Sequence, residues 1–323
     1  MIKRFFCLLF LVFVANNAFT EEIYISPKIS LKNSLLKEYL YTKNHKTSQL
    51  DWKIDNSPSF GFEADFVFER LFFGFDFSYG FYNFSGKMED FDWLDYENPN
   101  HVVRYSCHNL ILSEDLDFSI DFGFHFPLDN SKKNFGKMFL QFDFWRTFVS
   151  GHDGWRYYED WESSGNASGI FEGKVITYNP TIFSVLFGVG GNYYFGNKFS
   201  VNLDFLLGLI SSGTCVDNHI KAVTIFEDKV KGSFFLKGNL YFGFDFSKKN
   251  TLIFGGKINY LPPIFGESYA NGILSSQIGG FSSFSYDFYL SYRIRILWIR
   301  RLPWSSTVKD VDPIFSFSPF SGR

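Results

Sequence analysis

The 323-residue chain has no long apolar run after its first 20 residues. A membrane-spanning helix needs about 20 consecutive apolar residues, so such helices are excluded from the remainder. The formal net charge is only −3, which gives no reason to expect a nucleic-acid partner. There is neither an H-E-x-x-H motif nor a cluster of cysteine and histidine ligands, which argues against a metalloprotease, so we expect no metal site.

Aromatic residues, by contrast, are abundant. Phenylalanine occurs 45 times and tyrosine 18 times, and aromatic residues make up 22% of a chain that is also 20% charged. A soluble core does not need so many phenylalanines. A β-barrel with a lipid-facing exterior and aromatic girdles does need them, so the composition favours a membrane barrel.

The N-terminus has the order of regions found in a secretory signal. Lys3 and Arg4 precede the apolar run 5–15, and small or polar residues follow at 16–20. A charged region, an apolar region and a cleavage region in this order are typical of an export peptide, and the apolar run is too short for a membrane anchor. We therefore expect residues 1–20 to be a signal peptide.

Apolar and polar residues alternate without a lapse over residues 116–126, LDFSIDFGFHF, so that one face is apolar and the other polar. A β-sandwich would also alternate, but its buried faces favour Val, Ile and Leu and its strands are usually shorter. The pattern therefore predicts an all-β fold, a transmembrane antiparallel up-and-down barrel. Similar alternation occurs at 60–81, 138–148, 182–195, 199–209, 240–246 and 286–296.

The connections between these strands are of two kinds. Short ones carry turn residues and lysines, and long ones are polar and contain tryptophan or tyrosine. Because outer-membrane barrels alternate short periplasmic turns with long external loops, an N-terminus placed inside gives about ten strands. The short turns are 128–136, 196–198 and 247–250, and the external connections are expected near 42–46, 89–108, 150–170, 217–222 and 266–280.

The domain organisation is simple. No internal repeat or interdomain linker interrupts residues 21–296, so we expect a single barrel over this range. It is followed by a tail at 297–323 that is rich in proline, serine and phenylalanine. Barrels of this kind usually end on an aromatic strand residue, so this tail departs from the usual pattern. Nothing in the sequence assigns a structure to it.

Two polar stretches open external connections. One contains Asp90 and Asp92, and the other contains Asp217 and His219. Side chains at i and i+2 of an extended chain point to the same side, so each stretch presents two functional groups to one space. Both stretches belong to the same outer rim, and the walls of a small barrel are close together. Three carboxylates around one imidazole suit the activation of a water molecule.

The second stretch needs an irregularity in its strand. Alternation counted from Phe199 directs Asp217 and His219 outward, away from the aspartate pair. The alternation breaks at 206–210, and a β-bulge there would restore the inward direction. We therefore predict a bulge in this strand.

An ordered set of motifs accompanies the two stretches. It comprises QLDWK at 49–53, MEDFDWLDYENP at 88–99, SCH at 106–108, GKVITY at 173–178, DNH at 217–219 and a basic strand start at 229–231. With these motifs the chain resembles the omptins, the aspartate/histidine proteases of Gram-negative outer membranes. A lone D-x-D or D-x-H would mean little, and the specificity of the match lies in the ordered set.

The resemblance implies a ten-stranded barrel that projects above the outer leaflet, with an active groove at its outer end. It further implies that Asp217 orients His219, that Asp90 and Asp92 form a facing couple, and that a nucleophilic water lies between them. A neutral imidazole can take a proton from water. Two close carboxylates disfavour double ionisation, so one can hold a proton for the reaction. This predicts an endopeptidase without a metal or a covalent intermediate.

Omptins usually cut beside basic residues, and the resemblance implies substrate-binding positions at Glu38, Ser106, His108 and Cys215. Cys215 stands where the family has an acidic residue, so Glu38 alone predicts a weaker preference for Arg or Lys. Cys107 and Cys215 both adjoin the catalytic stretches. A cysteine pair in an exported protein is often oxidised, but sequence does not give the separation of these two.

Other classes of function stay open. The main alternative is a non-enzymatic barrel, an adhesin or narrow pore, that keeps the omptin scaffold. A serine-protease pair of Ser106 and His219 ranks lower because no strained turn or oxyanion motif surrounds the serine. A lipid-modifying barrel enzyme would need a serine with a histidine partner on the lipid-facing side, and we find none. Trp93, Trp155 and Trp161 are expected to serve an aromatic belt or loop packing.

The resemblance also implies partners. Omptins bind lipopolysaccharide through basic groups on the barrel exterior, and Arg146, Arg156 and Lys174 are candidate equivalents, although rim cations are usually only solvated. We expect polypeptide substrates outside the cell, outer-membrane lipid as a second partner and no nucleic acid. No cofactor is expected beyond a dependence on outer-membrane glycolipid. The predicted location is the outer membrane, with the groove facing the exterior.

Overall fold

The computed structural model describes residues 22–68, 70–130 and 133–297. Nearly all of them are in antiparallel strands, with a six-residue 3-10 helix η1 (Glu159–Ser164) near the outer end. Within these described ranges no helix is long and apolar enough to cross a membrane. The signal peptide predicted at 1–20 and all but the first residue of the tail predicted at 297–323 lie outside the described residues.

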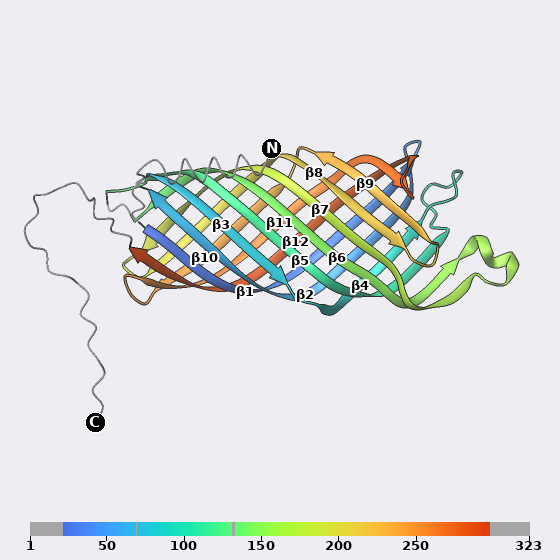
Figure 1. Ribbon diagram of the computed structural model, residues 1–323, viewed down its shortest axis with the longest axis horizontal. Coiled ribbons are helices and arrows are strands. Elements are labelled where there is room, and N and C mark those ends of the chain that lie inside the picture. The colour runs from blue at the N-terminus through green and yellow to red at the C-terminus, as the bar shows by residue number, and fades with distance from the viewer. Residues whose placement is uncertain (1–21, 69, 131–132, 298–323) are drawn as a thin grey trace, which may run out of the picture.

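The strands close into a ring, because β1 pairs with β2 on one side and with β12 on the other (Figure 1). In chain order they are β1 (Glu22–Thr42), β2 (His45–Phe68), β3 (Leu71–Gly80), β4 (Asn83–Asp92), β5 (Arg104–Pro127), β6 (Phe135–Tyr158), β7 (Ser168–Phe195), β8 (Phe199–His219), β9 (Thr224–Gly232), β10 (Leu236–Asp245), β11 (Asn250–Ala270) and β12 (Ile273–Leu297).

Twelve strand segments occupy ten positions in this ring. Both β3 and β4 lie between β2 and β5, and both β9 and β10 lie between β8 and β11. Each of these pairs is therefore one long barrel strand with a break, at 81–82 in the first and at 233–235 in the second. The predicted antiparallel up-and-down barrel of about ten strands is confirmed.

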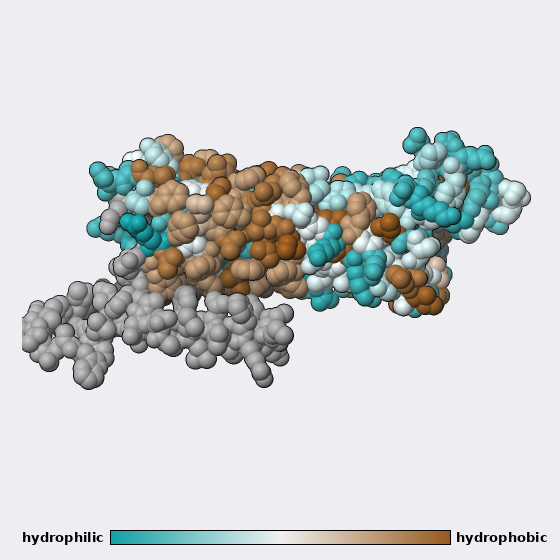
Figure 2. Space-filling view, turned by 90° about the horizontal axis from the view of Figure 1, so that it is seen from above, coloured by the Kyte–Doolittle hydropathy of each residue, from teal (hydrophilic) through white to brown (hydrophobic). Residues whose placement is uncertain are grey.

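A band of apolar side chains surrounds the half of the barrel where β1 begins and β12 ends (Figure 2). Phe60, Phe122, Leu203, Phe254 and Phe288, from five different strands, are each 47–59% exposed. A β-barrel exterior of this kind faces the hydrocarbon of a bilayer. On the face shown in Figure 2, the other half of the surface, beyond the band, is mainly hydrophilic with some apolar patches.

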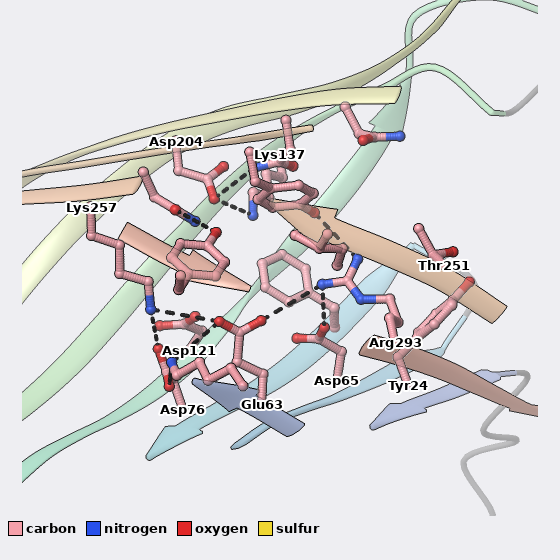
Figure 3. A pocket seen from close by; sticks show the side chains of 18 of the residues that line it. Tyr24, Glu63, Asp65, Asp76, Asp121, Lys137, Asp204, Thr251, Lys257 and Arg293 are labelled. Atoms are coloured by element: carbon pink, nitrogen blue, oxygen red, sulfur yellow. Dashed lines mark hydrogen bonds and ion pairs between the residues drawn. The ribbon is translucent and has the colours of Figure 1, made fainter. Parts of the chain in front are cut away.

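Inside the apolar band the lumen holds a cavity of about 1270 Å³ with charged walls. Lys257 pairs with Glu63 at 3.6 Å and with Asp76, and Arg293 pairs with Glu63 at 3.8 Å and with Asp65 at 3.7 Å (Figure 3). A buried charge without a partner is strongly unfavourable. Opposite charges on facing strands therefore neutralise one another in this part of the barrel.

Apolar rings close the lumen between this cavity and the outer end. Trp52 of β2 stacks on Tyr178 of β7 with ring centroids 5.5 Å apart, and Phe281 of β12 lies 6.3 Å from Tyr178 and 5.5 Å from Trp145 of β6. None of the four side chains is more than 8% exposed. Because these strands lie on different sides of the ring, the rings meet across the lumen. This aromatic plug forms the floor beneath the outer end.

The outer end holds five connections, at 43–44, 93–103, 159–167, 220–223 and 271–272. Each falls within or overlaps a predicted external connection, and the hairpin of β6 and β7 extends furthest from the rim (Figure 1). The connection expected near 266–280 is only a two-residue turn. Asn271 and Gly272 both have positive φ (49° and 78°), the combination that a tight hairpin requires.

Candidate active site at the outer end of the barrel

A bulge in β8 turns Asp217 and His219 towards the lumen. The pairing of β8 with β7 skips Leu209, which lies between the paired residues Gly208 and Ile210. Leu209 and Ile210 are consecutive and both exposed, at 48% and 50%, whereas the residues after them alternate in the opposite phase. The predicted bulge is confirmed, and it changes the direction of every later side chain in the strand.

Asp217 and His219 form a close pair. Nε2 of His219 lies 2.5 Å from Oδ2 of Asp217; Asp217 is buried, whereas the His219 side chain is 30% exposed. Burial alone would lower the pKa of His219, but the carboxylates of Asp217, Asp90 and Asp92 outweigh it and raise the pKa to about 9. The ring also packs edge-on against Phe226 of β9. The site therefore stabilises the charged imidazole and fixes its orientation.

Asp90 and Asp92 come from β4, on the facing wall. Asp90 lies between Leu50 of β2 and Ser106 of β5 in the strand register. Burial, followed by the charge of Asp92, raises the pKa of Asp90 to about 8, and burial raises the pKa of Asp92 as well. Oδ1 of Asp90 accepts no hydrogen bond from the described residues. At neutral pH the couple therefore holds a proton on Asp90.

The two walls act on each other electrostatically. The charges of Asp90 and Asp92 raise the pKa of His219. In turn, the charge of His219 lowers the pKa of Asp90 and the charge of Asp217 raises it. The structure thus brings together all four residues that the sequence singled out as candidate catalytic groups. In the described ranges no set of three or more His, Cys, Asp or Glu side chains is arranged to hold a metal ion.

Ser106 and His108 lie next to the aspartate couple on β5. Oγ of Ser106 is 2.9 Å from Nε2 of His108, and Nδ1 of His108 is 2.5 Å from the carbonyl oxygen of Asp153. Burial lowers the pKa of His108, which favours the neutral ring. Its Nδ1–H then donates to the carbonyl, and Nε2 accepts from the serine hydroxyl. The histidine partner of Ser106 is thus His108, and the serine-protease pair with His219 is not formed.

Glu38 of β1 belongs to the same cluster. It is only 1% exposed, and in the strand register it lies between Leu50 of β2 and Phe281 of β12. Burial, followed by the charges of Asp217 and other carboxylates of the cluster, raises the pKa of Glu38 well above its usual range. Oε2 of Glu38 has no hydrogen-bond partner among the described residues. A negative charge on this side chain therefore lacks a compensating group.

The two cysteines near the site are both free. Cys107 lies between Ser106 and His108, which are both buried, so it points to the opposite face of the barrel wall. Cys215 is 1% exposed and points inward, and burial raises the pKa of its thiol. The disulfide considered from the sequence is not formed, because the two thiols lie on opposite faces of the wall.

Asp228 of β9 is a member of the cluster that the sequence analysis missed. It pairs directly with Cys215 of β8 on one side and Ser268 of β11 on the other, and it is 1% exposed. Burial raises the pKa of Asp228 to about 7. The available signal was its place between Phe226 and Val230, where it is the polar member of an otherwise apolar inward-facing series.

The tryptophans and Arg156 lie at the outer end, Trp93 and Trp161 in connections and Trp155 and Arg156 near the end of β6. The expected loop packing is observed: Trp93, Trp155 and Trp161 lie against Phe91, Tyr105 and Tyr158. The Arg156 guanidinium lies 4.7 Å from the Trp161 ring and 5.1 Å from the Tyr158 ring. Because Arg156 pairs with the inward-facing Ser106, it lies on the inner face of the wall. Its suggested place on the barrel exterior is therefore wrong.

The closed antiparallel ring and its lipid-facing band define the chain as an outer-membrane β-barrel. Comparison with known families narrows this class. The model of the Omptin family matches residues 21–263, which is most of the chain, so the protein belongs to the Omptin family. The resemblance deduced from the ordered motifs is confirmed.

Comparison with solved structures gives a match that shares the fold. The crystal structure of the outer membrane protease OmpT from Escherichia coli matches with a TM-score of 0.76 and 16% identity, over 86% of this chain and 97% of that chain. The translocator domain of the autotransporter NalP from Neisseria meningitidis has a TM-score of 0.35 and 8% identity, over 91% of this chain and 95% of that one. No curated protein matches the chain. At these identities, the likeness to OmpT establishes the fold.

Proposed function

We propose that the protein is an outer-membrane endopeptidase that cleaves peptide bonds with a water activated between His219 and the couple of Asp90 and Asp92. Membership of the Omptin family supports a protease, and OmpT, which has the same fold, is described as an outer membrane protease. The observation that carries the proposal is the arrangement of the four groups. His219 pairs with Asp217 on one wall and faces the two aspartates on the other.

His219 is the general base of this mechanism. Its Nε2–H donates to Asp217, which leaves Nδ1 free to take a proton from water as the water attacks the peptide carbonyl. Asp217 then stabilises the imidazolium that forms and keeps the ring in one orientation. The imidazolium afterwards returns the proton to the leaving amine.

The aspartate couple has a complementary role. Because the pKa of Asp90 is raised to about 8, its carboxyl group holds a proton at neutral pH and can donate a hydrogen bond to the developing oxyanion. Asp92 supplies the second carboxyl group of the couple, which orients the attacking water. Two neighbouring carboxyl groups thus take different protonation states. Because the pKa of His219 is raised to about 9, the reactive form, with neutral His219 and protonated Asp90, is a minor population that is largest between the two pKa values.

The position of the site defines its substrates and surroundings. It lies above the aromatic plug and among the external connections, so the substrates are polypeptides outside the cell. The plug also argues against the alternative of a narrow pore, because buried rings block the lumen. No step needs a cofactor. We retain Arg146, whose side chain points outward, and the exposed Lys174 as lipid contacts on the exterior.

Digestion of a peptide library by the refolded protein tests this function, with and without added outer-membrane glycolipid. We expect internal cleavage beside Arg or Lys, because Glu38 is a buried carboxyl group next to the catalytic groups, and a bound basic side chain would favour its ionised form. The His219→Ala variant serves as the inactive control. If the folded wild-type protein cleaves no peptide under either lipid condition, the proposed function is wrong.

The pH dependence of cleavage follows from the His219 pair. A general base works only while it lacks its proton, and the pKa of His219 is raised to about 9. Activity should therefore fall as the pH drops through this raised pKa, with the acid limb of kcat/KM above the ordinary histidine value of about 6.5. Asp217→Asn removes the largest cause of the increase and should move the limb to lower pH. A rate that keeps rising into strongly acidic pH would instead indicate catalysis by the carboxyl groups alone.

A further inference from the structure

The side chain of Asp228 reaches from β9 past the neighbouring strand β11 to β12. In the register of the sheet, β11 lies between β9 and β12. The carboxyl group of Asp228 nevertheless lies against Gly279 of β12, where a Cβ atom would overlap it. Only a glycine leaves room for the carboxylate at this point. Gly279 pairs with Leu40 of β1, two residues from Glu38 on the same face of that strand.

The carboxylates of Asp228 and Glu38 therefore face a common space next to the catalytic groups. Each is 1% exposed, and the charge of Asp228 acts on Glu38. Neither oxygen of Asp228 accepts a hydrogen bond of ordinary geometry from the described residues, although the Ser268 hydroxyl lies beside it, and Oε2 of Glu38 is also without a partner.

No lysine or arginine from the described part of the chain forms an ion pair with either carboxylate. Buried carboxylates are normally paired or hydrogen-bonded, because removing an uncompensated charge from water is costly. The raised pKa values of Glu38 and Asp228 favour protonation while the site is empty, and a cationic group from outside the chain that entered this space would ionise and pair with them. The nearby His219 side chain is 30% exposed, so the cluster is accessible from outside at His219.

We propose that Asp228 and Glu38 together bind the basic side chain of the peptide substrate, so that Asp228 supplies the negative charge missing at Cys215. The inference rests on the proposed endopeptidase function and assigns a specificity role to a residue of another strand. Asp228 and Cys215 are directly paired across β8 and β9, so Asp228 places a carboxyl group on the adjacent strand, beside the position of Cys215. Two carboxylates from different strands suit the planar, forked guanidinium of arginine better than the compact ammonium group of lysine. Arginine should therefore be preferred to lysine.

This assignment changes the expectation drawn from the sequence. With Glu38 alone, the preference for a basic residue would be weak, and Cys215→Asp would sharpen it. With Asp228 present, the preference is already strong in the wild-type protein. Cys215→Asp would add a third carboxylate directly opposite Asp228, where mutual repulsion favours protonation over tighter binding. We therefore expect no sharpening from Cys215→Asp.

The decisive experiment compares two peptides that differ only in one residue beside the scissile bond, arginine or its uncharged isostere citrulline. In Asp228→Asn the ratio of kcat/KM for arginine over citrulline should fall by about 10–100-fold, because one charged partner is lost. The rate for citrulline should fall much less than the rate for arginine. The matched control is Glu227→Gln, since Glu227 is the preceding residue of β9 and is exposed on the opposite face. This variant should keep the wild-type ratio.

The outcomes separate this inference from the proposed function. Loss of both cleavages in wild type would refute the endopeptidase itself. A cleaving wild type whose arginine preference survives Asp228→Asn would refute only the role of Asp228. Inhibition of the wild-type protein by methylguanidine, compared with uncharged methylurea, needs no variant to fold. Stronger inhibition by methylguanidine supports a cation site, and equal inhibition by the two contradicts it.

Discussion

Replacing His219 with alanine should lower kcat/KM for peptide cleavage by about 10²–10⁴-fold, the usual contribution of a general base. The imidazole is the group at the outer end whose protonation Asp217 and the facing aspartates control together. Its side chain is partly exposed, so its removal should leave the barrel intact. Initial rates with an internally quenched peptide measure the activity, and heat-modifiable migration on a gel reports the folded barrel.

His101→Ala is the matched control for this variant. His101 is also a histidine of the outer end, but it lies in an exposed connection and bonds to Glu159 instead of an aspartate of the cluster. This variant should retain wild-type activity. Wild-type turnover in folded His219→Ala would remove the catalytic assignment, and an equal loss in both variants would indicate a general disturbance of the outer connections.

Asp90→Asn should lower kcat/KM by about 10²–10³-fold, the usual cost of losing a group that stabilises the oxyanion. An amide keeps the shape of the side chain and still has an N–H, but this N–H is a far weaker acid than the carboxyl group that the raised pKa keeps protonated on Asp90, so its hydrogen bond to the oxyanion is weaker. Glu89→Gln is the control, because Glu89 is the adjacent residue of β4, points to the other face and accepts a hydrogen bond from Tyr105. Similar rates for Asp90→Asn and Glu89→Gln would exclude Asp90 from the mechanism.

Much of the fold follows from local sequence. The strict alternation of 116–126 fixes a two-faced strand, and the broken alternation at 206–210 locates the bulge that turns Asp217 and His219 inward. The breaks between β3 and β4 and between β9 and β10 could not be predicted in this way. They depend on how two neighbouring strands pair on both sides, which is long-range information. The tight turn at Asn271 and Gly272 could have been predicted from the sequence, because Asn-Gly is a strong hairpin signal.

The candidate site was predictable where its residues form motifs along the chain. Asp90, Asp92, Asp217 and His219 stand at i and i+2, so one strand orients each pair. Asp228 belongs to no such motif, and its role depends on which strands lie beside it and on the absence of a side chain at Gly279. The aromatic plug was missed for the same reason, since Trp52 and Tyr178 meet only after the ring has closed.

The central claim is that the two walls of the barrel form one catalytic unit, and the double variant His219→Ala/Asp90→Asn tests it most directly. Groups that act together lose their effect together, so removing both costs little more than removing the more important one. We predict that kcat/KM of the folded double variant lies within about 10-fold of the less active single variant. Losses that multiply, so that the double variant shows the full product of the two single effects, would contradict a shared catalytic unit.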